Sequence, residues 1–337
     1  MTSPSAPAAI VRNVAARVGL VGNPSDGYSG AVLATTVPGM SATVKATAAD
    51  QVSFSAAGAT ISWESARAWW DHACHSGHGD DQRIISAALW VLVEHLRQHR
   101  DRVVNEGGVE LEWSTDIPRS VGLAGSSALA VGVIDATARA WKIDLDRRVV
   151  AALALIAERD VLGIAAGWQD RIVQSFGCTV LVDASRLEEV DGVRVPLVRT
   201  PTALAGAAMP LLVAWSDDAA SPSDDYHAPL RLTGAALATP MADLADLARR
   251  ATAALEAADL AGVAAAMDAG WLIRQRCAPL RPDHADLVEL VRAEGLAATT
   301  PGSGGSVVAV CMDEAAAERA IAAVQRAGCR FARIGAR

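Results

Sequence analysis

A short segment rich in glycine and serine constrains the fold of this chain more than any other stretch. It spans residues 118–128 and reads Pro-Arg-Ser-Val-Gly-Leu-Ala-Gly-Ser-Ser-Ala. Before it, apolar and polar residues alternate over 109–114, which is typical of a strand with one buried face. After it, apolar residues such as Val133, Ile134 and Trp141 recur at helical spacing. A chain that passes from strand to helix through such a turn belongs to the folds that mix the two elements.

The same segment suits an anion. Gly122 and Gly125 allow positive φ and a close approach of the backbone to a ligand. Ser126 and Ser127 stand at the predicted helix start, where free N–H groups and the helix dipole attract negative charge. Their hydroxyls are also able to ligate Mg²⁺. Serine is equally a preferred helix cap, so a phosphate site and an ordinary capped helix both remain open at this point.

Lysine is nearly absent from the chain, which narrows the possible phosphate chemistry. The 337 residues include two lysines, Lys45 and Lys142, and neither lies in a glycine-rich loop. The P-loop pattern Gly-x-x-x-x-Gly-Lys-Ser/Thr is therefore excluded. A Schiff-base enzyme would have to use one of these two residues. A cation at a phosphate site must then be an arginine.

Charge, hydropathy and cysteine usage predict a cytoplasmic protein that binds neither nucleic acid nor a membrane. The net charge of -8 lacks the basic character of a nucleic-acid-binding protein. No run reaches the ~18 apolar residues that cross a bilayer. The first ten residues lack the basic start and apolar centre of a signal peptide. The five cysteines are widely spaced and odd in number, which is typical of reduced thiols.

Hydrophobic patterns predict strands and helices that alternate along most of the chain. The predicted strands cover 17–22, 31–37, 41–46, 109–113, 179–183, 211–215 and 307–311. The predicted helices cover 82–99, the stretch after 128, 147–161, about 240–258, about 261–276 and about 313–327. The pattern weakens near 190–205, where Asp-Gly and two prolines occur, so we place a domain boundary there. The result is an α+β chain of two domains, 11–198 and 199–337.

Two carboxylate-bearing segments and a second glycine-rich turn flank these elements. Asp26 follows the strand that begins at Arg17, and a carboxylate in such a turn either accepts sugar hydroxyls or closes an Asx turn. Glu158 lies near a helix end, and Asp170 follows a glycine-containing loop. Two carboxylates near a phosphate loop suit metal binding and proton abstraction, although a surface carboxylate and a helix cap give the same pattern. The glycine-rich turn at 301–305 is by itself only a turn signal.

Taken together, these segments resemble the GHMP small-molecule kinases, a superfamily that includes galactokinase, mevalonate kinase and homoserine kinase. The resemblance spans nearly the whole chain in the family order, and it is strongest to the glucuronokinase branch. The segments that carry it are Gly-Asn-Pro-Ser-Asp (22–26), Ile-Pro-Arg-Ser-Val-Gly-Leu-Ala-Gly-Ser-Ser-Ala (117–128), Gly-Ile-Ala-Ala-Gly-Trp-Gln-Asp-Arg (163–171), Ser-Pro-Ser-Asp-Asp-Tyr-His (221–227) and Gly-Ser-Gly-Gly-Ser-Val-Val (302–308). The resemblance implies a two-layer α/β architecture, with an N-terminal domain like domain 2 of ribosomal protein S5 and a ferredoxin-like α+β C-terminal domain.

The resemblance also implies a role for each motif. Asp170 would be the base that takes the proton from the anomeric hydroxyl of a sugar, and Arg17 would stabilise charge on the transferring phosphoryl group. The residues implied to bind ATP are Pro118, Gly122, Leu123, Ala124, Gly125, Ser126, Ser127 and Ala128. Those implied to bind the sugar are Asp26, Asn23, Gln169, Gly302, Ser303, Gly304 and Gly305. Mg²⁺ would be held by Ser127, Ser126 and Glu158.

The implied activity is that of an ATP-dependent sugar-1-kinase, which transfers the γ-phosphoryl group of Mg·ATP to an anomeric hydroxyl. D-glucuronate is the leading acceptor, and another uronate, a hexose or a heptose is the alternative. A catalytically inactive sensor of sugar and nucleotide is a competitor from another class. A mevalonate- or homoserine-type kinase is disfavoured by the sugar-branch motif at 23–26. We expect a monomer or a homodimer.

The chain departs from the family pattern in two places. Many relatives carry Lys and Thr ahead of the last glycine motif, where this chain has Thr299 and Pro301. Side-chain contacts from these two positions are therefore not implied. The phosphate loop also has one more residue between Pro118 and Ser127 than in galactokinase-like relatives, so the choice between Ser126 and Ser127 stays open.

Other aromatic and metal-binding residue types have simple structural explanations. Trp69 and Trp70 would be able to flank adenine, but core packing is the favoured explanation. The cluster at 71–81 contains His72, Cys74, His75 and His78. Its spacing does not match common zinc sites, so we predict a solvated loop there.

Several charged residues remain open to two interpretations. Arg119, Arg171 and Arg83 are candidates to pair with a substrate carboxylate, and a surface or structural role is the more common one. His227 lies in a polar loop, with or without a substrate contact. Glu94, His95 and His99 are predicted to form the exposed face of a helix.

Overall fold

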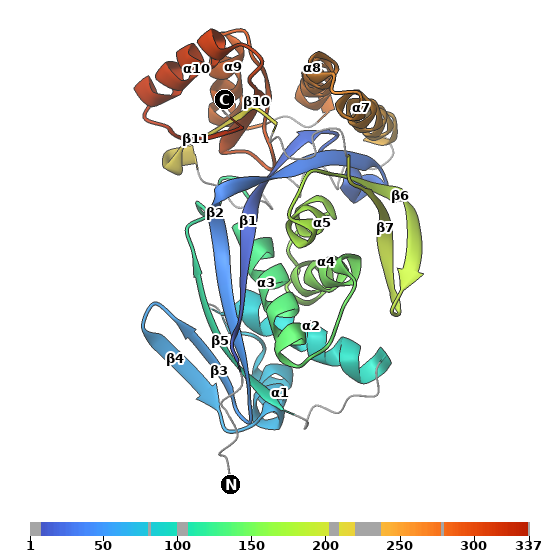
Figure 1. Cartoon of the computed structure of the whole chain (residues 1–337), viewed down its shortest axis with the longest axis vertical. Coiled ribbons are helices and arrows are strands. Elements are labelled where there is room, and N and C mark those ends of the chain that lie inside the picture. Colours follow the sequence, from blue (N-terminus) through green and yellow to red (C-terminus); the bar gives the residue numbers. More distant parts are fainter. Residues whose placement is uncertain are drawn as a thin grey trace.

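A computed structural model describes residues 8–79, 82–99, 107–201, 209–219, 237–277 and 280–335 (Figure 1). The strands are β1 (Ile10–Val21), β2 (Ala31–Ala49), β3 (Val52–Ala56), β4 (Ala59–Trp63), β5 (Gly108–Thr115), β6 (Val180–Val190), β7 (Val193–Arg199), β8 (Leu211–Trp215), β9 (Ala297–Thr299), β10 (Ser306–Val310) and β11 (Arg330–Ile334). The helices are α1 (Ala66–Ser76), α2 (Arg83–His99), α3 (Gly125–Ala140), α4 (Arg147–Ile156), α5 (Gln169–Phe176), α7 (Ala238–Glu256), α8 (Leu260–Cys277), α9 (Pro282–Arg292) and α10 (Glu314–Arg326). Strands and helices mix along the chain as the sequence predicts.

The first sheet has seven strands in the order β4-β3-β5-β2-β6-β7, and β1 pairs with β2. The paired strands are antiparallel except β3 and β5, which are parallel. Helices α2 to α5 lie against one face of this sheet (Figure 1). Strand β5 has one apolar face for the helices to cover: Val109 and Leu111 are buried, while Glu110 and Glu112 are exposed. The predicted alternation at 109–113 is confirmed.

Strand β2 corrects one prediction. The two strands predicted at 31–37 and 41–46 form a single strand, because the chain between them bulges without leaving the sheet. Ala15 of β1 pairs with Ser41 and the next residue, Ala16, pairs with Val37, so positions 38–40 have no partner on β1. Pro38 falls in this bulge, where its missing N–H removes no ladder bond. Strand β2 also changes its other neighbour there, from β6 to β5.

The second sheet has four antiparallel strands in the order β11-β8-β10-β9. Every residue of β8 and β10 is buried, which explains their uninterrupted apolar sequences. Leu212 and Ala214 of β8 pack in one cluster with residues of α9 and α10. Leu211 and Val213 face the other way and pack in the main core, together with residues of α7 and α8. This sheet is therefore covered on both faces.

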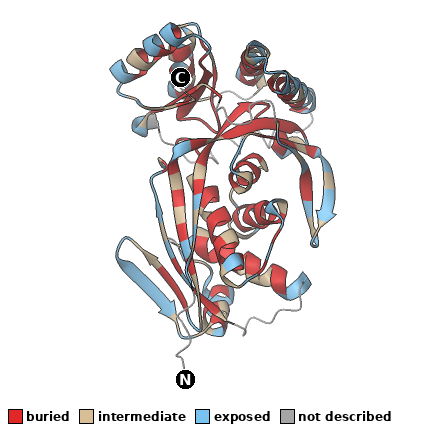
Figure 2. Ribbon diagram, in the orientation of Figure 1, coloured by how far each residue is buried: buried red, intermediate tan, exposed pale blue. Residues whose placement is uncertain are grey.

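The main hydrophobic core runs across the predicted domain boundary. Strand β7 of the first sheet ends at Arg199, and β8 of the second sheet begins at Leu211. Leu33 of β2 nevertheless shares one core cluster with Ala245 and Ala248 of α7. Figure 2 shows buried residues concentrated where the first sheet meets its helices, whereas β4 is exposed. The boundary at 198 and 199 stays a prediction.

Several elements were not predicted from the sequence. These elements are β3, β4, β7, β9, β11, α1 and α9. Strand β7 lies in the region of weak pattern near 190–205. It is an edge strand of the first sheet, and an edge strand can contain a proline such as Pro196. The helix predicted over 147–161 is α4 followed by a π-helical turn at Ala157–Val161.

The sequence predicts neither a membrane-spanning helix nor a disulfide. Among the described residues, no helix combines the length and the apolar character needed to cross a bilayer. All five cysteines lie in described segments, and each is a free thiol.

Candidate active site

One large cavity, of about 780 Å³, collects most of the predicted site residues. It lies between the phosphate loop, the turn after β1, the start of α5 and the glycine-rich turn at 301–305. The predicted residues that line it are Arg17, Asn23, Asp26, Pro118, Gly122, Leu123, Ala124, Gly125, Ser126, Glu158, Gln169, Asp170, Gly302 and Ser303. The other four, Ser127, Ala128, Gly304 and Gly305, lie behind this wall rather than on it.

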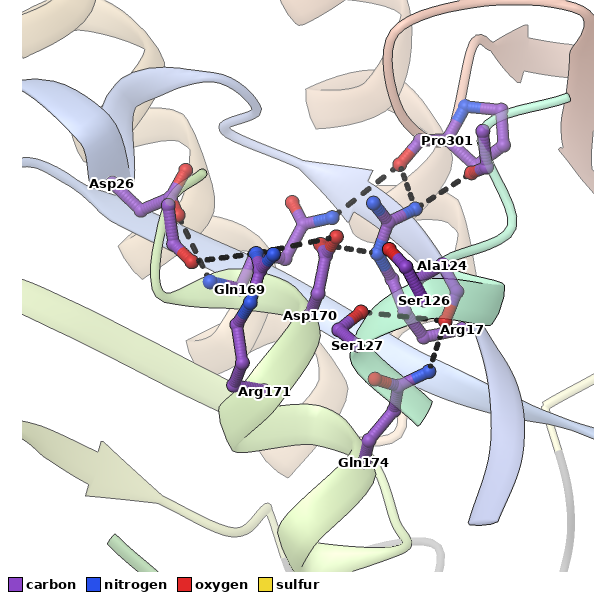
Figure 3. Close-up of polar contacts among 12 residues, drawn as sticks. Arg17, Asp26, Ala124, Ser126, Ser127, Gln169, Asp170, Arg171, Gln174 and Pro301 are labelled. Carbon is purple, nitrogen blue, oxygen red and sulfur yellow. Dashed lines mark hydrogen bonds and ion pairs between the residues drawn. The ribbon is translucent and has the colours of Figure 1, made fainter. Parts of the chain in front are cut away.

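The phosphate loop ends in a helix start that no serine caps. Ala124 is the residue before α3, it has a left-handed conformation, and it forms no side-chain cap. The Ser126 hydroxyl donates instead to Glu158 Oε1 over 2.8 Å. The Ser127 hydroxyl donates back to the Ala124 carbonyl over 3.3 Å (Figure 3). The interpretation as an ordinary serine cap is therefore wrong. The first N–H groups of α3 are available to an anion at the cavity wall.

Gly122 lets the two glycine-rich loops touch. Its φ is +77°, and a Cβ there would stand 2.8 Å from the Gly304 carbonyl oxygen. A larger residue would push the loops apart and strain the backbone. Gly304 does not line the cavity. Its carbonyl oxygen lies close to Gly122, which brings the two glycine-rich loops together.

Arg17 connects three parts of the site from its buried position on β1. Its Nε donates to Asp170 Oδ1 over 2.5 Å. Its Nη1 donates to the carbonyl oxygens of Gly122 and Pro301 over 2.8 and 3.0 Å (Figure 3). The Arg17 side chain is 6% exposed, so these bonds form in a largely dehydrated setting where charge-assisted bonds are strong. Arg17 thus holds the predicted base beside the phosphate loop.

Three consecutive residues at the start of α5 point into different parts of the cavity. Each helical residue advances about 100° around the axis, so neighbours face different ways. The backbone N–H of Gln169 donates to Asp26 Oδ2 over 2.9 Å, and its side chain donates to the Pro301 carbonyl over 3.4 Å. Asp170 faces Arg17, and Arg171 turns toward Glu158. One helix end therefore contacts Asp26, Arg17 and Glu158.

Asp26 is a buried carboxylate on the cavity wall. Its exposed fraction is 6%, and burial raises its pKa from 3.8 to about 6. The Gln169 N–H opposes this rise, while the nearby charge of Asp170 adds to it. A Cβ on Gly167 would collide with the Asp26 carboxylate, so a glycine is needed there. Asp26 accepts this bond from a residue 143 positions away, which favours a role in the site over a local Asx turn.

Glu158 is fully buried and paired, so the interpretation as a surface carboxylate is wrong. Arg171 donates to Glu158 Oε2 through Nε over 2.7 Å and through Nη2. Within the described residues, no cluster of three or more acidic, histidine or cysteine side chains is able to hold a metal ion. Mg²⁺ at nucleotide sites commonly needs only one or two carboxylates beside phosphates and water. Glu158 and Ser126 fit that smaller donor set.

Sequence reasoning missed several contributors to the site. Gln174 donates to the Ala124 carbonyl over 2.8 Å and so holds the end of the phosphate loop (Figure 3). Pro301 contributes a main-chain carbonyl, which no side-chain pattern reveals. Tyr28 and Trp113 line the cavity without belonging to a recognised motif.

The arginine candidates divide into two kinds. Arg83 and Arg119 are exposed residues that line the cavity. Arg171 is buried and forms an ion pair with Glu158, which is a structural contact. His227 and the segment 221–227 lie outside the described residues.

The aromatic and histidine features away from the cavity have structural roles. Trp69 is buried in the core, and Trp70 stacks on Trp90 with ring centroids 5.4 Å apart, so core packing explains them. The loop predicted at 71–81 is wrong over its first part, because residues up to Ser76 belong to α1. Ser65 caps this helix by accepting the N–H of Ala68.

The predicted exposed face of α2 is also partly wrong. His95 is 4% exposed and packs its ring against His99, with centroids 5.0 Å apart. Glu94 pairs with Arg97 at the surface.

Two family models match the chain. The model described as the GHMP kinases N terminal domain covers residues 83–178, and the GHMP kinases C terminal model covers 251–329. Together they span slightly more than half of the chain. The chain belongs to the GHMP kinase family. The family and the fold class predicted from the sequence are confirmed.

Individual GHMP proteins resemble the chain over most of its length. Glucuronokinase 1 of Arabidopsis thaliana is 28% identical over 319 residues, which are 91% of this chain and 86% of that protein. Galactokinase of Lactococcus lactis, solved with galactose, has a TM-score of 0.72 at 16% identity and covers 97% of this chain and 94% of its own. Phosphomevalonate kinase of Streptococcus pneumoniae, solved with phosphomevalonate and AMPPNP, has a TM-score of 0.76 at 13% identity and covers 96% and 100%. The two structural likenesses show the shared fold.

Proposed function

We propose that this GHMP kinase transfers the γ-phosphoryl group of Mg·ATP to the anomeric hydroxyl of a sugar, with D-glucuronate as the leading acceptor. The observation that carries the proposal is the Asp170–Arg17 pair, which stands between the phosphate loop and Asp26 in one cavity. The similarity to Glucuronokinase 1 supports the choice of acceptor.

The described residues suit each requirement of such a transfer. Asp26 and Gln169 would orient the acceptor, and Asp170 would take the proton of the attacking hydroxyl. The helix start at Gly125 and Ser126 would bind phosphate oxygens through backbone N–H groups. Phosphoryl transfer needs mainly positioning and charge neutralisation, and these groups supply both.

The charged groups would stabilise the transferred phosphoryl group. Arg17 would place its positive charge beside that group. Glu158 and Ser126 would hold Mg²⁺, which supplies charge neutralisation on the phosphates when bound.

A screen of acceptors tests the proposal. The purified chain is incubated with Mg·ATP and a panel of free sugars, including uronic acids, hexoses and heptoses, and ADP formation is measured. We expect D-glucuronate to give the highest turnover and an acid-labile glycosyl phosphate. An acid-stable phosphomonoester would contradict transfer to the anomeric oxygen. Equal, background ADP formation with every sugar, together with intact nucleotide binding, would favour a catalytically inactive sensor of sugar and nucleotide.

A heptose is the second candidate acceptor, because one local similarity favours it. The D-glycero-alpha-D-manno-heptose 7-phosphate kinase of Campylobacter jejuni is 44% identical over 67 residues, which are 20% of each chain. The panel therefore includes a heptose and its 7-phosphate. Higher turnover with either than with D-glucuronate would replace the leading acceptor.

A further inference from the structure

Arg171 contacts three residues of the site, yet no step of the proposed transfer uses it. It is 4% exposed. Its Nε and Nη2 both donate to Glu158 Oε2. Its Nη1 donates to the Gly167 carbonyl over 2.9 Å and lies 3.5 Å from Asp170 Oδ2. The guanidinium thus contacts the carboxylate expected to hold a metal, the predicted base and the loop beside Asp26.

The contacts leave Glu158 with one usable oxygen. Two N–H groups of Arg171 converge on Oε2, so the guanidinium lies against this oxygen. Oε1 accepts the Ser126 hydroxyl and is therefore the oxygen at the start of α3. Without Arg171, the fully buried Glu158 would lose its compensating charge and both oxygens would be free to turn.

The number of usable oxygens matters for the choice of cation. Ca²⁺ takes six to eight oxygen ligands and often binds both oxygens of a carboxylate, whereas Mg²⁺ requires a small octahedral shell that phosphates and water largely fill. A carboxylate limited to Oε1 suits the smaller shell. Partners behind a metal ligand commonly change metal affinity by roughly 10–100-fold when they are removed.

We propose that Arg171 is a positioning residue that limits Glu158 to a single metal-facing oxygen, and so makes nucleotide binding depend on Mg²⁺ and discriminate against Ca²⁺. This inference rests on the proposed function, since it needs a nucleotide site beside Ser126. It assigns Arg171 no contact with the sugar, because the donors that the structure shows are directed at Glu158, Gly167 and Asp170.

Binding measurements on the full chain test this role without relying on turnover. Arg171→Lys keeps the positive charge but lacks the two N–H groups of one plane that converge on Oε2. Arg159→Lys is the matched control, because Arg159 adjoins Glu158 in sequence but pairs with Asp160 at the surface. The Kd of a non-hydrolysable ATP analogue is measured by calorimetry with Mg²⁺, with Ca²⁺ and with EDTA.

We expect Mg²⁺ to tighten binding by the wild-type chain and by Arg159→Lys, and Ca²⁺ to do so less. In Arg171→Lys, the gain from Mg²⁺ should shrink by roughly tenfold, while the Kd in EDTA changes by less than about threefold. The ratio of the Kd values with Ca²⁺ and Mg²⁺ should move toward one. A purely structural Arg171 would instead weaken binding equally in all three conditions, and that result would overturn the inference.

Two further outcomes separate the inference from the proposed function. If the wild-type chain binds the analogue no better with Mg²⁺ than with EDTA, the proposed function itself fails. If the wild-type gain is present and Arg171→Lys retains it, only the inference fails. Arg171→Gln, which keeps two N–H donors without the charge, replaces the lysine variant if that variant does not fold. Failure of both to fold would assign Arg171 to folding and would also contradict the inference.

Discussion

Replacing Asp170 with Asn tests the assignment of the base directly. An amide has nearly the same shape as a carboxylate, and its oxygen still accepts the Arg17 N–H that now spans 2.5 Å. Arg17 also keeps its bonds to the Gly122 and Pro301 carbonyls, at 2.8 and 3.0 Å. The variant therefore loses a proton acceptor and a negative charge while the surrounding loops stay in place.

The size of the effect follows from these contacts. A positioned general base contributes about 10²–10⁴-fold to a rate, and an amide cannot replace it. We expect kcat to fall by roughly 10³-fold, which corresponds to about 4 kcal/mol in the activation barrier. Because the phosphate loop is held by Arg17 and Gln174 as before, the Kd for ATP should change by less than about threefold. The loss of charge beside the 5% exposed Arg17 should lower the free energy of unfolding by roughly 1–3 kcal/mol.

The assay measures ADP release with the acceptor that the screen identifies, nucleotide binding by calorimetry, and thermal unfolding. Asp160→Asn is the control, because its carboxylate pairs with Arg159 at an exposed turn. That variant should match the wild-type chain in all three measurements. A kcat for Asp170→Asn within a few-fold of wild type would remove Asp170 from the role of base. A parallel loss of ATP affinity would show that the substitution reshaped the nucleotide site.

Three other predictions follow from buried contacts. Burial raises the pKa of Asp26 from 3.8 to about 6, so the folded chain binds this proton more tightly than the unfolded chain and loses stability as the pH rises from about 4 to 6. Asp26→Asn should therefore raise the free energy of unfolding at pH 8 by about 3 kcal/mol, with little gain near pH 4. The KM of this variant for the acceptor should rise, and the wild-type KM should also rise below pH 6. Gly122→Ala should destabilise the chain by about 1–3 kcal/mol and weaken ATP binding, because its φ is +77° and its Cβ would stand 2.8 Å from the Gly304 carbonyl oxygen. Gln174→Ala should weaken ATP binding by roughly fivefold, because the Ala124 carbonyl loses a donor at 2.8 Å.

Simple outcomes would contradict each of these three predictions. Equal stabilisation by Asp26→Asn at pH 4 and pH 8, in denaturant unfolding, would show that its ionisation does not carry the penalty. A Gly122→Ala variant as stable as wild type would mean that the two glycine loops separate without cost. Unchanged calorimetric affinity for ATP in Gln174→Ala would show that the start of α3 keeps its position without the bond from Gln174 to the Ala124 carbonyl.

The sequence predicted the parts of the site that lie in continuous motifs. Residues 118–128 combine glycines, serines and a change from strand to helix pattern, and this local chemistry is legible without a structure. The edge strands β4 and β7 were missed for the opposite reason. Strand β4 has only five residues and most of them are exposed, and β7 contains a proline, so both give weak strand signals.

Contacts between distant segments could not be predicted from spacing. Arg171 and Glu158 are 13 residues apart, in a helix and in a π-helical turn, and nothing in the sequence indicates that they meet. Gln174 reads as a polar position on a short helix, yet it holds the Ala124 carbonyl, 50 residues away. The fold creates these pairs, so their energetic roles appear only when the elements are packed.

The departure at Pro301 has a physical explanation at Arg17. Pro301 contributes its carbonyl oxygen, which accepts the Arg17 Nη1 over 3.0 Å and the backbone N–H of Gly19 over 3.0 Å. A main-chain carbonyl is present whatever the side chain, so this link between the two halves of the chain tolerates substitution at position 301. The arginine itself has no such freedom, because its Nε must reach Asp170 while Nη1 reaches the two carbonyls. A lysine has one nitrogen centre and cannot span these acceptors. The scarcity of lysine therefore matches a site in which the fixed geometry of guanidinium, rather than charge alone, joins the base to both glycine loops.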